Sequence, residues 1–468
     1  MAKENRIEND VIGQLPINSD SLSGIHTARA IENFGVVGGC VNPRLLRSYG
    51  TVKYCCAMAN HDLGYLSDEI YPYISQAAKS VEAGDFDVNQ APAALQGGAG
   101  TSTNMFINEL IANKALLLMG KKIGDYDVVS PLNHINLHQS TNDTYPTALK
   151  VAALIALSEL EQVVSELTDA FQRKEREFAD VVRLARTELC DAVPITLGQN
   201  FGAWAEAFSK DRWRIYKCSE RLRVINLGGT AIGTGNGADR RYIFAVAEML
   251  RQETNLPLAR AENMVQATQN CDEFVEVSGI LKALATNLFK ISNDLRLLAS
   301  GPESGLGEIK LPARQAGSSI MPGKINPVIT EMVSQVAMQA ISHDSAITLA
   351  AMNGQLELNA FLPLLSHNLL AMLDELITAC EKMRAFMVED IEADKARCED
   401  NLHNSTAVIT AFIGKIGYDK ASEVSKKASQ SGKTIKQVLL EEGLCSEDDY
   451  DMLTSPEAAL ALGFRRRK

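Results

Sequence analysis

Apolar and small residues recur at steps of three and four along much of this chain, which is the period of an amphipathic helix. After Pro146 they fall at Leu149, Ala153, Ala156, Leu160, Val163, Leu167 and Phe171. Similar stretches cover residues 203–224, 261–300, 327–350 and 360–387. Several are longer than an average helix of about 11–12 residues. The pattern therefore predicts a mainly α protein with a bundle of long helices.

Glycine- and proline-rich segments interrupt the helical pattern at residues 97–100, 194–198, 228–237 and 301–323. We interpret these segments as loops, and we expect Pro146 in the first turn of its helix, where proline is tolerated. After residue 389 the predicted helices become shorter and more charged. We therefore expect a small helical C-terminal domain.

Composition excludes several classes of function. The 468-residue chain has a net charge of −12, which leaves no basic footprint for nucleic acid. Neither a signal peptide nor an apolar stretch of membrane-spanning length is present, so we expect a soluble, cytoplasmic protein with no membrane partner. The nine cysteines and seven histidines show no metal-ligand spacing, and the glycines of 233–240 lack a strand-to-helix context for a dinucleotide. We expect no cofactor.

The segment GSSIMPGKINPV, Gly317–Val328, carries the clearest chemistry. Its glycines and prolines specify a loop between helices, and its serines, Lys324 and Asn326 supply hydroxyls, a positive charge and an amide. Such a loop is suited to wrapping a small carboxylate. A mobile surface linker explains the glycines but not the set of polar groups.

This loop resembles the signature loop of the aspartase/fumarase superfamily, and other blocks match in order and spacing. They are QGGAGTSTNM (Gln96–Met105), HQSTNDTYPT (His138–Thr147) and, less completely, RTELCDAVPITLGQ (Arg186–Gln199). The resemblance runs from about Arg29 to the C-terminus and favours the ammonia-lyase branch. It implies three mostly helical domains, which we place at 1–141 (N-terminal), 142–396 (central bundle) and 397–468 (small C-terminal). It also implies a homotetramer whose active sites are each shared by three subunits. The implied reaction is β-elimination of ammonia from L-aspartate to give fumarate.

The resemblance also implies roles for particular residues. Ser318 would be the general base, although without the resemblance we would interpret it as shaping the loop. Lys324 and Asn326 would hold one substrate carboxylate. The donors for the other carboxylate, where charge develops, would be Thr101, Ser140, Thr141 and Ser319; Asn142 and Thr187 would lie near the leaving group and carboxylate. For Ser140–Asp143, capping of the following helix is a competing role.

Three positions depart from the family pattern. Glu188 follows Thr187 where the family usually has histidine or glutamine, and a carboxylate there would favour a cationic leaving group. It could instead cap a backbone amide or pair with Arg186. Phe106 replaces an asparagine of related aspartases, and Asn236 with the next glycine replaces Leu-Asn.

These departures leave alternatives open. The chain could be a superfamily lyase that eliminates a substituted or quaternary amine, such as trimethylamine from ergothioneine, or less readily water from malate. A non-catalytic relative is disfavoured because the chemical residues are retained. Arg29 fits either a substrate carboxylate or an interface ion pair.

Overall fold

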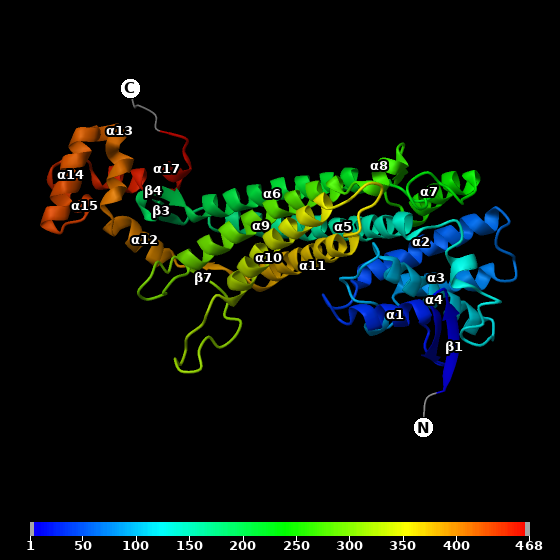
Figure 1. Ribbon diagram of the computed structural model, residues 1–468. Coiled ribbons are helices and arrows are strands. Elements are labelled where there is room, and N and C mark those ends of the chain that lie inside the picture. The colour runs from blue at the N-terminus through cyan, green and yellow to red at the C-terminus, as the bar shows by residue number, and fades with distance from the viewer. Residues whose placement is uncertain (1–3, 464–468) are drawn as a thin grey trace. The chain divides into compact units, whose positions relative to one another are not determined.

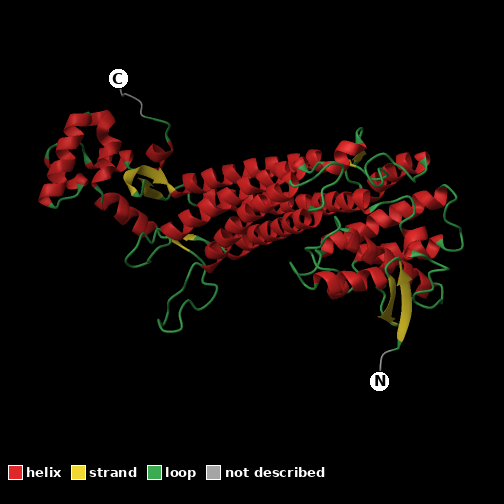
Figure 2. Ribbon diagram, viewed as in Figure 1, coloured by secondary structure: helices red, strands yellow, loops and turns green. Residues whose placement is uncertain are grey.

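A computed structural model describes residues 4–463, and helices dominate it (Figure 1). Figure 2 shows that the strands are short and few beside the helices. The mainly α class is therefore confirmed. The described residues form two compact units. The first contains the chain up to Glu161, with Arg214–Ala283 and Gln339–Leu376, and the second contains Gln162–Trp213, Leu284–Met338 and the chain from Ile377 onward.

Long helices, each of 25 to 37 residues, contribute to both units and confirm the predicted long-helix regions. They are α5 (Thr141–Glu177), α6 (Leu197–Leu222), α9 (Asp272–Leu298), α10 (Val328–Met352) and α11 (Leu362–Phe386). The stretch 261–300 is not one helix, because the backbone is extended at Asn270 and separates α8 (Met264–Gln269) from α9. Within the second unit, Phe171 of α5 packs on Phe201 of α6 at a ring distance of 5.8 Å.

Helix α5 begins earlier than the sequence predicts. The Ser140 hydroxyl accepts a hydrogen bond from the Asn142 amide at 3.2 Å, and the Asp143 carboxylate accepts one from the Ser140 amide at 3.0 Å. This reciprocal cap satisfies amides at the helix start. Pro146 consequently lies inside the helix rather than in its first turn, and that prediction is wrong.

The first unit surrounds α2 with shorter helices, which Figure 1 shows together with the N-terminal hairpin. The apolar side of α2 is almost fully buried against α3, α4 and α7. The elements of this unit, besides its share of the long helices, are β1 (Asn5–Asp10), β2 (Gly13–Asn18), α1 (Ile25–Phe34), α2 (Pro43–Asp62), α3 (Tyr71–Ala83), η1 (Val88–Gln90), α4 (Thr101–Leu118), the π-helical turn η2 (Pro131–Ile135), β5 (Val224–Ile225), α7 (Arg240–Thr254), β6 (Ala259–Arg260) and α8. β1 pairs with β2 antiparallel, and β5 with β6 parallel.

The second unit contains an antiparallel hairpin that the sequence pattern did not predict. Strands β3 (Val182–Thr187) and β4 (Cys190–Thr196) pair with a bulge between Leu184 and Arg186. Leu184 belongs to a buried core that includes Phe412 and Tyr450, so the C-terminal helices hold the hairpin. The other elements of this unit are β7 (Ile309–Lys310), η3 (Val388–Asp390), β8 (Glu392–Ala393), α12 (Lys395–Asn404), η4 (Thr406–Phe412), α13 (Ile413–Ile416), α14 (Tyr418–Ser431), α15 (Ile435–Glu441), α16 (Glu447–Leu453) and α17 (Pro456–Leu460).

The predicted division into three domains at residues 141 and 396 stays a prediction. Within residues 4–463, no helix combines the length and the apolar character needed to cross a membrane.

Candidate active site

The N-termini of α4 and α5 lie against each other in the first unit. Gly100 precedes α4 with φ of +93°, and a Cβ atom there would lie 2.1 Å from the ring of Tyr145 in α5. Only glycine permits both this backbone conformation and this close approach. The contact brings Thr101, the first residue of α4, to the start of α5. The Thr101 hydroxyl is exposed and donates its proton to the Gly98 carbonyl at 2.7 Å.

The start of α5 presents Ser140, Thr141 and Asn142. The Ser140 hydroxyl acts as the helix cap and keeps its own proton for a further acceptor. The buried Thr141 hydroxyl accepts from the Asn104 amide at 3.0 Å, and the Asn142 amide donates to the Ala231 carbonyl at 2.7 Å. A helix N-terminus favours anions, so this position suits a carboxylate. Capping and substrate binding are compatible for Ser140.

Asp143 is a buried member of this region that sequence reasoning treated only as part of a cap. Its carboxylate accepts hydrogen bonds from the amides of Gly228 at 3.1 Å and Thr230 at 2.9 Å. Burial outweighs these bonds and raises the pKa of Asp143 to about 6. The glycine-rich segment that begins at Gly228 therefore wraps a carboxylate of its own chain. The spacing of its glycines did not reveal this function.

Lys53 of α2 is a second buried charged residue that the sequence did not single out. Its side chain is 1% exposed, and Nζ donates to Asn136 at 3.1 Å and to Gln139 at 2.8 Å. Burial lowers the pKa of the Lys53 ammonium to about 7. The sequence did contain a signal for this residue, namely a lysine within a helix that is buried on most sides.

The signature loop is folded around Ser318 in the second unit. The half-buried Ser318 hydroxyl accepts hydrogen bonds from the amides of Ile320 at 3.2 Å and Met321 at 2.9 Å. The ends of the loop are joined because the Gly317 amide donates to the Lys324 carbonyl at 2.8 Å. A Cβ at Gly317 would lie 2.6 Å from that carbonyl oxygen, so the glycine is required.

The other loop residues divide into two kinds. Ser319 and Lys324 are exposed, and within the described chain the Lys324 ammonium has no carboxylate partner. The Asn326 side chain, by contrast, donates its amide to the Gly317 carbonyl at 2.7 Å. Asn326 therefore braces the loop with one amide hydrogen, and its second amide hydrogen and its side-chain oxygen are left for a ligand.

Thr187 and Glu188 lie at the tip of the β3–β4 hairpin, and both are exposed. The two turn residues, Glu188 and Leu189, have φ of +54° and +65°. Arg186 is not the partner of Glu188: its guanidinium donates to the buried carboxylate of Glu308 at 2.9 Å. In the described part of the chain, Glu188 has neither a hydrogen bond nor an ion pair, so both structural roles considered for it are absent.

The other positions singled out in the sequence lie apart from the donors or make structural contacts. Phe106 is buried on the α4 face that also carries Leu110, whereas Asn104 and Thr101 lie on another face. The Asn236 carbonyl accepts from the Thr230 hydroxyl at 3.0 Å. The Arg29 guanidinium pairs with Asp10 at 2.7 Å within its own chain.

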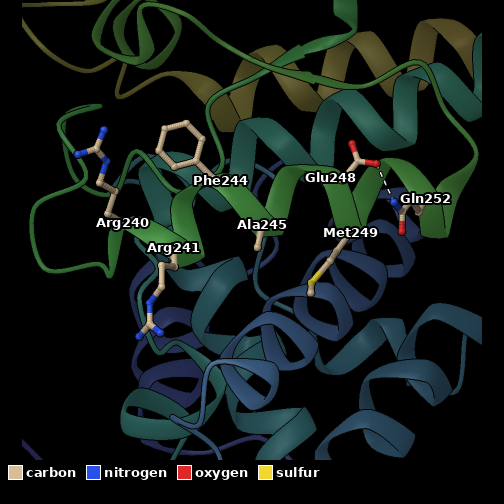
Figure 3. Close-up of a pocket in the computed structure, with 7 residues that line it drawn as sticks. All are labelled: Arg240, Arg241, Phe244, Ala245, Glu248, Met249 and Gln252. Carbon is tan, nitrogen blue, oxygen red and sulfur yellow. Dashed lines mark hydrogen bonds between the residues drawn. The ribbon is translucent and has the colours of Figure 1, made fainter.

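A cavity of about 690 Å³ lies along α7, outside the signature blocks. Figure 3 shows Phe244 and Arg240 on one side of the helix and Met249 on the other. None of the predicted site residues lines it, so we do not assign the substrate to it. In the described chain no three His, Cys, Asp or Glu side chains gather as a metal site requires.

Comparison with known proteins gives consistent matches along the whole chain. Residues 13–342 match the family described as Lyase, and residues 408–460 match the Fumarase C C-terminus family. The chain is 42% identical to an aspartate ammonia-lyase of a Bacillus species, over 99% of each chain. It is 38% identical to the aspartate ammonia-lyase of Escherichia coli (strain K12), over 100% of this chain and 98% of that one.

Two solved structures extend the comparison to the fold. One is a fumarate lyase:delta crystallin from Brucella melitensis bound to cobalt, with a TM-score of 0.93, 42% identity, and 98% and 100% of the two chains covered. The other is a class II fumarase from Schistosoma mansoni, with a TM-score of 0.89, 29% identity, and 98% and 99% covered.

Proposed function

Since the chain belongs to the aspartase/fumarase superfamily of lyases, we propose that it eliminates ammonia from L-aspartate to give fumarate. It is a carbon–nitrogen lyase, and its substrate class is an amino acid or dicarboxylate. The relatives from Bacillus and Escherichia coli are both named aspartate ammonia-lyase, and these names support aspartate as the substrate here.

The reaction requires a base that removes a proton and donors that stabilise the charge left behind, and the chain's side chains can supply both. The proton to be removed is on the carbon next to the side-chain carboxylate, and its loss leaves negative charge on that carboxylate. Preorganised donors are needed there because the charge develops in the transition state. We assign this role to the hydroxyls of Thr101, Ser140 and Thr141, with Ser319 from the signature loop. Thr101 must release its bond to Gly98 to donate.

We assign the general base to Ser318. An ordinary serine hydroxyl is too weak an acid to ionise near neutral pH. The observation that supports this assignment is the pair of amide hydrogen bonds that the Ser318 oxygen accepts from Ile320 and Met321. Consecutive amides stabilise an oxyanion, so they lower the cost of forming an alkoxide.

Lys324 and Asn326 are assigned to the other substrate carboxylate, and Asn142, Thr187 and Glu188 to the region of the leaving group. The Lys324 ammonium is exposed and has no carboxylate partner among residues 4–463, which supports its assignment. Asn326 uses one amide hydrogen to hold the loop in shape and has a second one to donate to the carboxylate. The carboxylate of Glu188 has no partner in the described part of the chain, and its charge favours a cationic leaving group over a hydroxyl.

How the chain associates is part of the proposal. A homotetramer with shared active sites would bring the signature loop of one chain to the hydroxyl donors of another. The three-domain division and a cytoplasmic location are further predictions for the same protein.

An absorbance assay for fumarate tests the function. We expect turnover of aspartate, no turnover of malate, and unchanged activity after exhaustive chelation. Release of trimethylamine or a substituted amine in preference to ammonia would instead favour the alternative lyase, which Glu188 also suits. No fumarate or other elimination product from any of these substrates would contradict both.

A further inference from the structure

We propose that Lys53 is a positioning residue for the elimination reaction, and that its ammonium fixes the segment that delivers the Ser140 and Thr141 hydroxyls to the substrate carboxylate. Lys53 touches no reacting atom in this role; it acts through Asn136 and Gln139. This inference rests on the proposed function only for its kinetic consequences.

Lys53 reaches the segment from a neighbouring helix. It lies in the middle of α2, is 1% exposed, and donates to the side-chain oxygens of Asn136 at 3.1 Å and Gln139 at 2.8 Å. Gln139 is the residue directly before Ser140. The Gln139 side-chain amide nitrogen donates to the carbonyls of Ile135 and Leu137, so both the oxygen and the nitrogen of this side chain are hydrogen-bonded.

Asn136 connects Lys53 to Thr141. Its side-chain oxygen also accepts from Asn104 at 3.1 Å and from Asn108 at 3.2 Å. The Asn104 amide in turn donates to the Thr141 hydroxyl at 3.0 Å. An uninterrupted path of hydrogen bonds therefore runs from the ammonium of Lys53 to the hydroxyl of a proposed donor.

A purely structural role does not call for a charged group at this place. Burying an ammonium costs free energy, and apolar residues of similar volume often replace buried charges without loss of stability. Among the described residues Lys53 has no ion-pair partner, and the nearby Tyr49 ring lies 6.0 Å from Nζ. What the ammonium uniquely supplies is several donors converging on one polar segment.

Lys53→Met removes these donors and keeps most of the side-chain volume. The matched control is Lys174→Met, because Lys174 is also a buried lysine. It donates to the Ile391 carbonyl at 2.8 Å and to the Glu177 carboxylate at 2.9 Å, and neither partner belongs to the segment that Lys53 holds. We expect Lys53→Met to lower kcat/KM for aspartate by about tenfold or more, the size of a lost charged hydrogen bond, and to raise KM. Lys174→Met should leave both constants near the wild-type values.

Coupling to a donor separates positioning from general destabilisation. If Lys53 acts through Ser140, the loss in the double variant Lys53→Met/Ser140→Ala should be clearly smaller than the product of the two single losses. Gln139→Met provides a second route, since it removes an acceptor and keeps the lysine; we expect a loss of kcat/KM in the same direction.

Hydrogen exchange gives a readout that does not depend on the substrate. The amides of Ser140 and Asn142, which are bonded in the helix cap, should exchange faster in Lys53→Met and unchanged in Lys174→Met. Wild-type kinetic constants, multiplicative losses in the double variant, or unchanged exchange in folded Lys53→Met and Gln139→Met would each overturn the inference. A wild-type protein that does not act on aspartate would contradict the proposed function, while the exchange result would still decide the role of Lys53.

Discussion

The side-chain amide of Asn226 donates a hydrogen bond to the main-chain carbonyl of Asn142 at 3.0 Å. In an uninterrupted helix that carbonyl would accept from the amide four residues later, but Pro146 stands there and has no N–H. Asn226 is 1% exposed, so the bond is sheltered from water. The proline inside α5 is thus tolerated because a side chain from outside the helix supplies the missing donor.

We predict that Asn226→Ala destabilises the protein by about 1–3 kcal/mol, because it leaves the Asn142 carbonyl without its partner. In a Pro146→Ala background the cost should fall, since alanine at that position restores the helical amide. Urea unfolding at one protein concentration measures both. Asn226 also donates to the Thr268 hydroxyl at 2.9 Å, so Thr268→Val serves as the control for that second bond. An equal cost in both backgrounds would contradict the explanation.

Ser318→Ala should abolish turnover while leaving the fold and the assembly intact. The reason is that no other group in the loop is held by amide donors in the way that the Ser318 oxygen is. Fumarate formation measures activity, with circular dichroism and size-exclusion chromatography as controls. A loss below about tenfold, or ~1.4 kcal/mol of barrier, is too small for a general base.

Lys324→Arg should raise KM for aspartate substantially although it keeps the positive charge. The loop is closed by the hydrogen bond between the Gly317 amide and the Lys324 carbonyl, and a planar guanidinium does not take the place of a compact ammonium there. Steady-state kinetics with aspartate check this. Kinetic constants equal to those of the wild type would show that Lys324 does not contact the substrate.

Glu188→Gln should weaken the preference for cationic leaving groups, because it removes the negative charge and leaves the hairpin unchanged. Glu188→His should move the site toward the usual family pattern. Competition between aspartate and substituted aspartates measures the preference, with malate as the comparison because its hydroxyl leaving group is uncharged. Unchanged amine kinetics in Glu188→Gln, or efficient dehydration of malate by the wild type, would refute the role.

Two buried ionisable residues, Asp143 and Lys53, predict a pH dependence of stability. The pKa of Asp143 is raised to about 6, so its contribution is present below about pH 4 and is lost as the pH rises through 6. The pKa of Lys53 is lowered to about 7, so its contribution is present near pH 10 and is lost as the pH falls through 7.

We therefore expect the wild type to lose stability relative to Asp143→Asn between about pH 4 and 6, and to gain relative to Lys53→Met between about pH 7 and 10. Denaturant unfolding across this range is the measurement. Stability differences that do not vary with pH would show that the two groups titrate normally.

The sequence predicted the mainly α fold and the long helices because their apolar period extends over many turns. It did not predict the β3–β4 hairpin, because buried and exposed residues do not alternate regularly along its strands and a bulge lies between Leu184 and Arg186. The hairpin is stabilised by a core that includes Leu184 and Phe412 from distant segments. The start of α5 was misplaced because proline was given more weight than the Ser140 cap.

The chemical blocks were found in the sequence by resemblance, but their supporting residues were not. Lys53 and Asp143 lie 90 residues apart in the sequence, and only folding brings their partners together. The role of Asn326 as a brace of the loop likewise depends on its contact with the Gly317 carbonyl, which spacing alone does not reveal.

The turn at Glu188 and Leu189 has an evolutionary consequence. Both residues adopt a left-handed backbone conformation, which costs about 1–2 kcal/mol per residue outside glycine, and turns of this kind ordinarily favour Asn-Gly. The strands on either side are held by the core beneath them and not by the identity of the turn. Mutation can therefore exchange the side chain at position 188 without shifting the strand register, and the tip is a natural place for substrate preference to diverge between descendants while the scaffold is inherited unchanged.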